Sequence, residues 1–275
     1  MSSSALDARV GALAGRWLTP EEETLLSNEL SVLDTSDLDN ITFWGKIDGN
    51  DADYLIVVGQ DKLKEEDDYP DQSFWFCSTT DFKLRPLTTT WATRHPEVNA
   101  TTMRFTGDAA TELVAAVEAT EDDEETKGTA AVDAFTEKDL LACVVKDIHG
   151  ATAVVPRGAF VVDPLHRVAK NVNFTGLSVA EAQDVSSYLL FRKPSEGAAV
   201  RDIDGLLKPE CFLEPISATH PTGAWSVQAD PCQTTVVIKS LVYPGFSFYH
   251  EPGTARFGSL YMGDGRKNED LAFMI

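Results

Sequence analysis

The stretch that decides the fold is ITFWGKIDGNDADYLIVV, residues 41–58, in which two apolar runs flank a polar turn. Apolar residues recur at every second position in the first run, which is the period of a β-strand with one buried face. The turn contains Asp48-Gly49-Asn50-Asp51, and the second run is rich in β-branched residues. The pattern predicts a β-hairpin. We expect its first strand to place four residues on one face: Ile41, Phe43, Gly45 and Ile47.

Upstream of the hairpin the sequence predicts helices. Residues 5–18 are rich in Ala, Leu and Arg, and a second helix is expected to begin after Thr19. Thr19 and Glu22 have the spacing of a capping box, and the proline between them fits the first helical position. The expected buried side of this helix consists of Leu26, Leu30 and Leu33. We treat residues 1–40 as an N-terminal helical segment.

Downstream, further strands are predicted at 73–77 and 82–84, followed by a helix over 111–118. Thr136 is expected to open a helix with a buried stripe of four residues, Leu141, Val144, Val145 and Ile148. A strand is predicted at 153–155. Ser178 and Glu181 form a second capping box, and the helix that it opens is expected to bury Ala182, Val185 and Leu189.

The last part of the chain is predicted to be strands and turns, with strands at 224–229, 234–242, 246–250 and 257–262. The fold class is therefore α+β, with N-terminal helices and a mixed, mainly antiparallel sheet with packed helices. Residues 41–275 are expected to form a single α+β domain with an acidic loop insert at about 119–131.

The chain is strongly acidic, with 44 Asp and Glu against 23 Lys and Arg and a formal charge of −21. Residues 1–140 hold 30 of the acids and only 11 of the bases, including the runs Glu65–Asp68 and Glu121–Glu125. Such runs stay solvated, so both are expected to be loops. The charge opposes binding to nucleic acid or to anionic lipid. We expect a soluble, intracellular protein, because no apolar run is long enough to span a membrane and no export signal is visible.

No residue pattern indicates catalysis. The segment 245–249 lacks the second glycine of a nucleophile elbow, and 263–265 is expected to be a tight turn. Residues from Asp48 onward do not match a calcium loop, and the five histidines lack metal-ligand spacing. The four cysteines are far apart and are expected to be reduced. We expect no catalytic, cofactor or metal residue. Two alternatives remain open: an enzyme with a scattered active site, and an acidic adaptor or calcium-buffering protein.

Aromatic residues beside glycines stand out in the predicted strands. Buried aromatic side chains dominate the energetics of cores and interfaces, and glycine lets backbones approach closely. The interface or core candidates are Phe43, Trp44, Trp225, Tyr243, Phe246, Phe248, Tyr249, Phe257 and Tyr261.

Several blocks of sequence that contain these aromatics resemble one family. They are FWGKIDGNDADYLIVVGQ (43–60), VPRGAF (155–160), NFTGLSVAEAQDVSSYLLFRKP (173–194), GAWSVQ (223–228) and the final stretch from Ser240 to Ile275. In this order the blocks resemble the radial spoke head protein 9 family of motile cilia and flagella. Tyr243 departs from the tryptophan expected there, and residues 61–140 are the least similar.

The resemblance implies a non-catalytic structural subunit in the axoneme, without a cofactor. It also implies assembly with other radial spoke head proteins, especially the 4/6-type paralogues, in a spoke head that faces central-pair projections. The implied function is spoke-head assembly and mechanical signalling between the central pair and the dynein arms. From the charge distribution we expect residues 1–140 to face solvent or the central pair, and residues 141–275 to pack inward.

Overall fold

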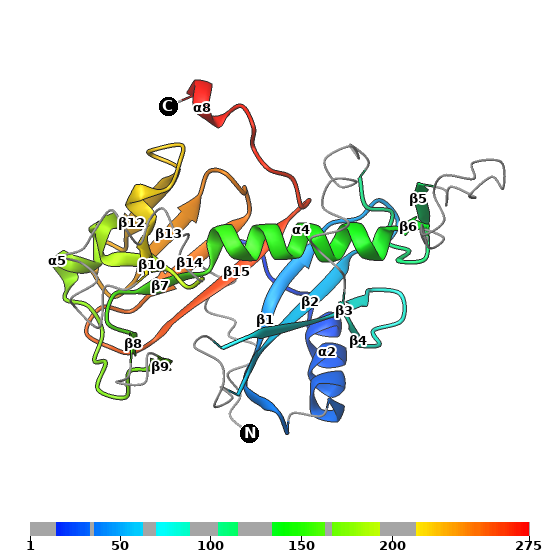
Figure 1. The fold of residues 1–275 in the computed structure, drawn as a ribbon, viewed down its shortest axis with the longest axis horizontal. Helices are drawn as coiled ribbons and strands as arrows, with labels where there is room; N and C mark the ends of the chain where they lie inside the picture. The colour runs from blue at the N-terminus through cyan, green and yellow to red at the C-terminus, as the bar shows by residue number, and fades with distance from the viewer. Residues whose placement is uncertain are drawn as a thin grey trace, which may run out of the picture.

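A computed structural model describes residues 15–33, 36–62, 70–88, 104–114, 134–162, 167–192 and 213–274. A mixed eight-stranded sheet forms the centre of the molecule, and the long helix α4 (Glu137–Thr152) crosses one of its faces (Figure 1). Helix α2 (Pro20–Val32) packs on the opposite face. The α+β prediction is confirmed.

The sheet has the order β12-β13-β14-β15-β1-β2-β3-β4. Its strands are β12 (Trp225–Ala229), β13 (Val236–Ser240), β14 (Phe246–His250), β15 (Phe257–Gly263), β1 (Leu38–Ile47), β2 (Tyr54–Asp61), β3 (Gln72–Ser78) and β4 (Arg85–Pro86). Neighbours pair antiparallel except β1 and β15, which are parallel. The hairpin at 41–58 and the four strands predicted after residue 224 are therefore confirmed. The parallel pair joins them into one sheet.

Smaller elements surround the sheet. They are β5 (Glu112–Val114), β6 (Phe135–Thr136), β7 (Val154–Pro156), β8 (Phe160–Val162), β9 (Val168–Lys170), β10 (Tyr188–Leu190), β11 (Glu214–Pro215), α5 (Val179–Ala182), α8 (Leu271–Met274) and the 3-10 turns η1 (Val185–Ser187) and η2 (Ile216–Ala218). β11, β10 and β7 form a three-stranded sheet, while β5 with β6 and β8 with β9 form two-stranded ones.

The prediction that Ile41, Phe43, Gly45 and Ile47 share one face is wrong. A bulge between Phe43 and Gly45 adds one residue to β1, because Phe43 pairs with Val57 and Gly45 pairs with the next residue of β2, Ile56. Side chains after the bulge therefore point to the opposite face from the one that strict alternation predicts. Phe43 packs on the α2 side, whereas Trp44 and Ile47 pack on the α4 side. Both faces of the hairpin are therefore buried, and each holds one of the two larger apolar cores.

The N-terminal part of the fold agrees with the predicted cap. The Thr19 hydroxyl accepts from the Glu22 N–H, and the Glu22 carboxylate accepts from the Thr19 N–H at 2.8 Å. Leu26 is buried against the sheet, while Leu30 and Leu33 are only half-buried. Of the helix predicted over 5–18, residues 1–14 lie outside the described part, and 15–18 are not helical.

Helix α4 begins after Thr136 as predicted, and it buries Leu141, Val145 and Ile148, with Val144 half-buried. The helix predicted over 111–118 is wrong for the described residues, because Glu112–Val114 is a strand that pairs with β6. Residues 115–120 lie outside the described part, as do both acidic runs. Here pairing with a distant segment outweighs local helix propensity.

Two further predictions differ from the structure. The strand expected at 82–84 lies at 85–86, because residues 79–81 form a turn and Phe82 has a positive φ of 50°. The helix opened by Ser178 keeps its capping box but ends at Ala182. Asp184 then caps the turn η1, and Leu189 lies on β10.

Candidate interface

The structure places seven of the nine aromatic candidates inside the core of the chain itself. These are Phe43, Trp44, Tyr243, Phe246, Phe248, Tyr249 and Tyr261. Trp225 and Phe257 are partly exposed. The Trp225 indole N–H donates to the Thr219 hydroxyl at 2.9 Å, and Phe257 packs against Phe248 with ring centroids 6.1 Å apart. All seven pack within the two larger apolar cores of the chain.

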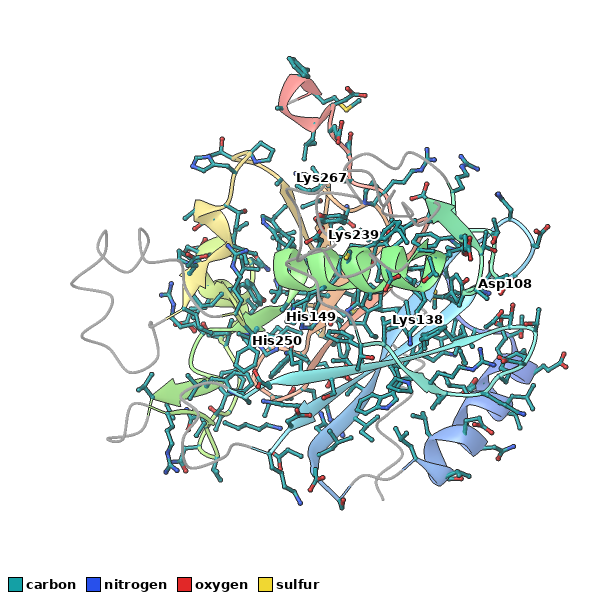
Figure 2. All side chains as sticks on the ribbon, turned by 45° about the vertical axis from the view of Figure 1, so that its right-hand side comes forward. Asp108, Lys138, His149, Lys239, His250 and Lys267 are labelled. Atoms are coloured by element: carbon teal, nitrogen blue, oxygen red, sulfur yellow. The ribbon has the colours of Figure 1, made fainter. Side chains whose placement is uncertain are left out.

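Trp44 connects the sheet to helix α4. Its ring packs on Tyr261, with centroids 5.3 Å apart, and its indole N–H donates to His149 Nδ1 at 3.1 Å. His149 points from α4 toward the sheet (Figure 2), where Phe74 meets it edge-on. Burial among these apolar groups lowers the pKa of His149 to about 4. The imidazole is therefore neutral at physiological pH and acts as an acceptor for Trp44.

His250 has a comparable structural role on β14 (Figure 2). Its Nε2 accepts from the Leu177 N–H at 3.2 Å, and its Nδ1 lies 3.1 Å from the Arg256 carbonyl oxygen. A neutral ring protonated on Nδ1 satisfies both contacts, because a carbonyl only accepts. Burial lowers the pKa of His250. The side chain thus connects the loop before α5 to the β14–β15 hairpin.

A fully buried carboxylate, Glu137, fixes the start of α4. It accepts from the Tyr54 hydroxyl at 2.7 Å, the Thr106 hydroxyl at 2.7 Å and the Gly107 N–H at 2.9 Å. The Thr106 N–H also donates to it, at 3.0 Å. Burial, together with the bond to Glu137, raises the pKa of Tyr54. Sequence reasoning missed this site, since its donors lie about 30 and 80 positions away and no local spacing marks them.

Lys46 connects α2 to the hairpin. Its Nζ lies 2.8 Å from a Glu22 oxygen and 2.8 Å from an Asp53 oxygen. Burial opposes the charge of both Lys46 and Glu22, but their hydrogen bonds outweigh it. As a result the pKa of Lys46 is raised and that of Glu22 is lowered. Glu22 therefore caps its helix and pairs with a half-buried cation at the same time.

The remaining candidate for contact with another protein is a set of exposed apolar side chains. They are Val32, Val172, Val179, Leu241, Phe273 and Met274. Phe273 and Met274 belong to α8, which stands clear of the sheet in Figure 1, and Leu241 lies beside the segment that leads to it. Sequence reasoning missed them because it searched for aromatics in strands. The sequence feature that could have indicated Phe273 and Met274 is the apolar run Leu271–Ile275, which directly follows five polar residues.

Other kinds of site find no support in the part of the chain that the structure describes. Among those residues, no group of three or more His, Cys, Asp or Glu side chains is arranged to hold a metal ion. No helix there is long and apolar enough to cross a membrane. Cys77 and Cys143 are buried, Cys232 is exposed, and none of the three is in a disulfide; Cys211 lies outside the described residues.

The chain is similar over nearly its whole length to curated proteins, although no family model matches it. It is 34% identical over 273 residues to "Radial spoke head protein 9 homolog" of Danio rerio, covering 97% of this chain and 96% of the relative. The protein of the same name from Homo sapiens is 32% identical, and the alignment covers 99% of this chain and 99% of the relative. The one from Bos taurus is also 32% identical, with 95% of each chain covered. The similarity therefore spans at least 95% of the length of each of these relatives.

Proposed function

The chain belongs to the radial spoke head protein 9 family, and from this we propose that it is a structural, non-catalytic subunit of the radial spoke head. In this role it is a cytoskeletal component of the axoneme in motile cilia and flagella. It contributes to the assembly of the spoke head and to mechanical signalling between the central pair and the dynein arms.

The observation that carries the proposal is identity of 30–34% along at least 95% of the chain and of each relative. Similarity confined to one block would support a shared fold element, whereas similarity from end to end supports a shared place in an assembly. The packing is consistent with this role. One sheet with an apolar core on each face is suited to bearing load without rearranging.

A non-catalytic role is also consistent with the use of the buried polar groups. Glu137, His149 and His250 are three of the buried or half-buried ionisable side chains in the described part of the chain, and an active site would be expected to draw on such groups. Each of them is hydrogen-bonded to groups of the chain itself, while the second ring nitrogen of His149, Nε2, is buried without a hydrogen-bond partner among the described residues. Their contacts join elements of the fold to one another, which is a structural task.

Within the spoke head we propose contact with other radial spoke head proteins, especially the 4/6-type paralogues. We further propose that the part of the chain with most of the negative charge, residues 1–140, presents that charge to solvent or to the central-pair projections. The electrostatic repulsion between a negatively charged surface and another one extends over a Debye length of about 8 Å at physiological salt. It would favour transient contact over permanent binding to another negative surface.

The proposal is tested by expressing the tagged chain in ciliated cells that lack their own family member. The expected result is that the chain is recovered in isolated axonemes and that the spoke heads reappear in electron tomograms. A chain that stays entirely in the detergent-soluble fraction, with the spokes still headless, would contradict the proposal.

A further inference from the structure

The residues from Phe174 to Leu177, here called segment 174–177, are held on the β14–β15 hairpin by contacts that centre on His250. The Leu177 N–H donates to His250 Nε2 at 3.2 Å, and the Leu177 carbonyl accepts from the Gly253 N–H at 2.8 Å. The Phe174 ring stacks on the imidazole, with centroids 6.3 Å apart. Both backbone polar groups of Leu177 therefore bond to one hairpin, and one of these two bonds depends on a titratable ring.

The approach of the segment to the hairpin is close. Gly176 has a positive φ of 94°, and a Cβ atom there would lie 2.1 Å from the Thr254 carbonyl oxygen. Leu177 is 8% exposed and belongs to the larger apolar core, whereas Val172 and Val179 on either side of the segment are exposed. The segment is not a strand of the eight-stranded sheet. Its separation from the hairpin therefore breaks none of the pairing within that sheet.

The two ring nitrogens of His250 have opposite roles. Nδ1 lies 3.1 Å from the Arg256 carbonyl oxygen, which only accepts, so Nδ1 carries the proton and the Nε2 lone pair receives the Leu177 N–H. Protonation of the ring adds an N–H at Nε2 that points at the N–H of Leu177. Two donors then face each other, and the hydrogen bond is lost. The imidazole is fully buried, so its positive charge is also poorly solvated.

The charged and titratable groups that face His250 in the described part of the chain do not offset this effect. Glu251, on the same strand, raises the pKa of His250, but burial outweighs it and the pKa is lowered. The Arg256 guanidinium lies 3.8 Å from the Glu251 carboxylate. From β10, the Tyr188 ring meets the imidazole edge-on, and its hydroxyl donates to the Ala182 carbonyl. Segment 174–177 has no titratable side chain.

We propose that the contact between His250 and Leu177 is a pH-sensitive switch, in which protonation of His250 in mild acid releases segment 174–177 from the β14–β15 hairpin while the eight-stranded sheet stays folded. Release exposes the Phe174 ring and the Leu177 side chain. The inference goes beyond the proposed function, because the switch is a property of the chain itself and does not depend on its place in an axoneme.

Amide hydrogen exchange of the purified full chain, resolved by residue with NMR, tests the proposal. Each measured rate is divided into the intrinsic rate at the same pH, which corrects for the ordinary slowing of exchange in acid. His250 in the released state titrates near its usual pKa of about 6.5. The protection factors of the Leu177 and Gly253 amides are therefore expected to fall by up to about tenfold between pH 7.5 and pH 5.5.

The amides of β2 are the internal reference, because they lie in the middle of the sheet. They are expected to keep higher protection factors than Leu177 at both pH values. An unchanged protection factor at Leu177 would overturn the inference. Equal protection factors at Leu177 and in β2 would also overturn it, since the segment would then separate only when the whole chain unfolds. This comparison uses the wild-type chain and does not require any variant to fold.

Two variants assign the effect to one histidine. His250→Gln keeps a carbonyl oxygen for the Leu177 N–H but does not titrate, so the fall in protection at Leu177 is expected to disappear. His149→Asn is the matched control, because it removes the titration of the other buried imidazole, and it is expected to retain the fall. A His250→Gln chain in which Leu177 loses protection as in the wild type would overturn the inference.

Discussion

At Gly45 the chain has no room for a side chain, because β1 and β15 meet there in parallel. A Cβ atom at this position would lie 2.2 Å from the Tyr261 carbonyl oxygen, which is backbone and cannot swing aside. Gly45→Ala is therefore expected to lower the free energy of unfolding by about 1–3 kcal/mol, measured by urea denaturation.

Gly150 is the matched control for this substitution. It lies within α4 and has no atom within 4 Å of an added Cβ. Gly150→Ala is expected to be neutral or to stabilise the protein by up to about 1 kcal/mol, because alanine is the better helix former. Equal urea midpoints for the two variants would show that β1 and β15 do not approach as closely as described.

The buried neutral imidazole of His149 is expected to make the free energy of unfolding fall in mild acid. Its pKa is about 4 in the folded chain and about 6.5 when unfolded, so the unfolded state binds more protons between these values. The contribution of His149 is fully present above pH 6.5 and is lost as the pH falls toward 4. Over the whole window the loss in the free energy of unfolding amounts to on the order of 3–4 kcal/mol. Urea unfolding at pH 7 and at pH 5 measures the effect.

The variant His149→Asn keeps an acceptor near Trp44 but does not titrate, so its stability is expected to change less between pH 7 and pH 5. If His149→Asn shows the same slope as wild type, the imidazole is not buried as a neutral acceptor.

At the scale of elements, the start of α4 depends on the Glu137 carboxylate, which accepts from Tyr54, Thr106 and Gly107. Glu137→Gln replaces one acceptor oxygen by an amide N–H₂, which is a donor. That donor would face groups that now donate to the carboxylate, namely backbone N–H groups and hydroxyls. The expected loss is about 2–3 kcal/mol in the free energy of unfolding, because hydrogen bonds to a buried charge are replaced by an unsatisfied contact. Thermal and urea unfolding both report it.

The control for this variant is Glu21→Gln in the first turn of α2, where the side chain is exposed. This change is expected to cost no more than about 0.5 kcal/mol. A Glu137→Gln protein as stable as the Glu21→Gln protein would refute the role of the buried carboxylate.

Elements with a local signature were predictable from the sequence. The hairpin after Ile41, the caps at Thr19 and Ser178, and α4 all depend on patterns within one segment. Features that depend on distant partners were not. The strand at 112–114 pairs with the distant β6, and Gly45 was the only mark in the sequence of the bulge after Phe43. The parallel pairing of β1 with β15 joins residues more than 200 positions apart.

The candidate site was predictable only in part. Aromatic residues beside glycines were predicted to be core or interface, and seven of the nine are buried in the chain. A strand pattern in the sequence indicates that an apolar side chain is to be buried. It does not indicate whether the side chain is buried in the core of its own chain or in an interface with another protein. Exposure of Phe273 and Met274 depends on where the chain leaves β15, which is a property of the tertiary structure.

At the scale of the whole molecule, the division of charge along the sequence is not a division between separate bodies. β1, β2 and β3 from the acidic part and β12 to β15 from the nearly neutral part belong to one sheet. Both parts contribute to the same two large cores. Forces applied to either part are therefore transmitted through backbone pairing, which is consistent with the role in mechanical signalling that we propose.

The most direct test of this account is to purify the tagged chain with its neighbours from axonemes and to identify them by mass spectrometry. The account predicts that radial spoke subunits, including other spoke-head proteins, are recovered in fixed proportion to the chain. Recovery of a metabolic enzyme complex without spoke subunits would contradict it.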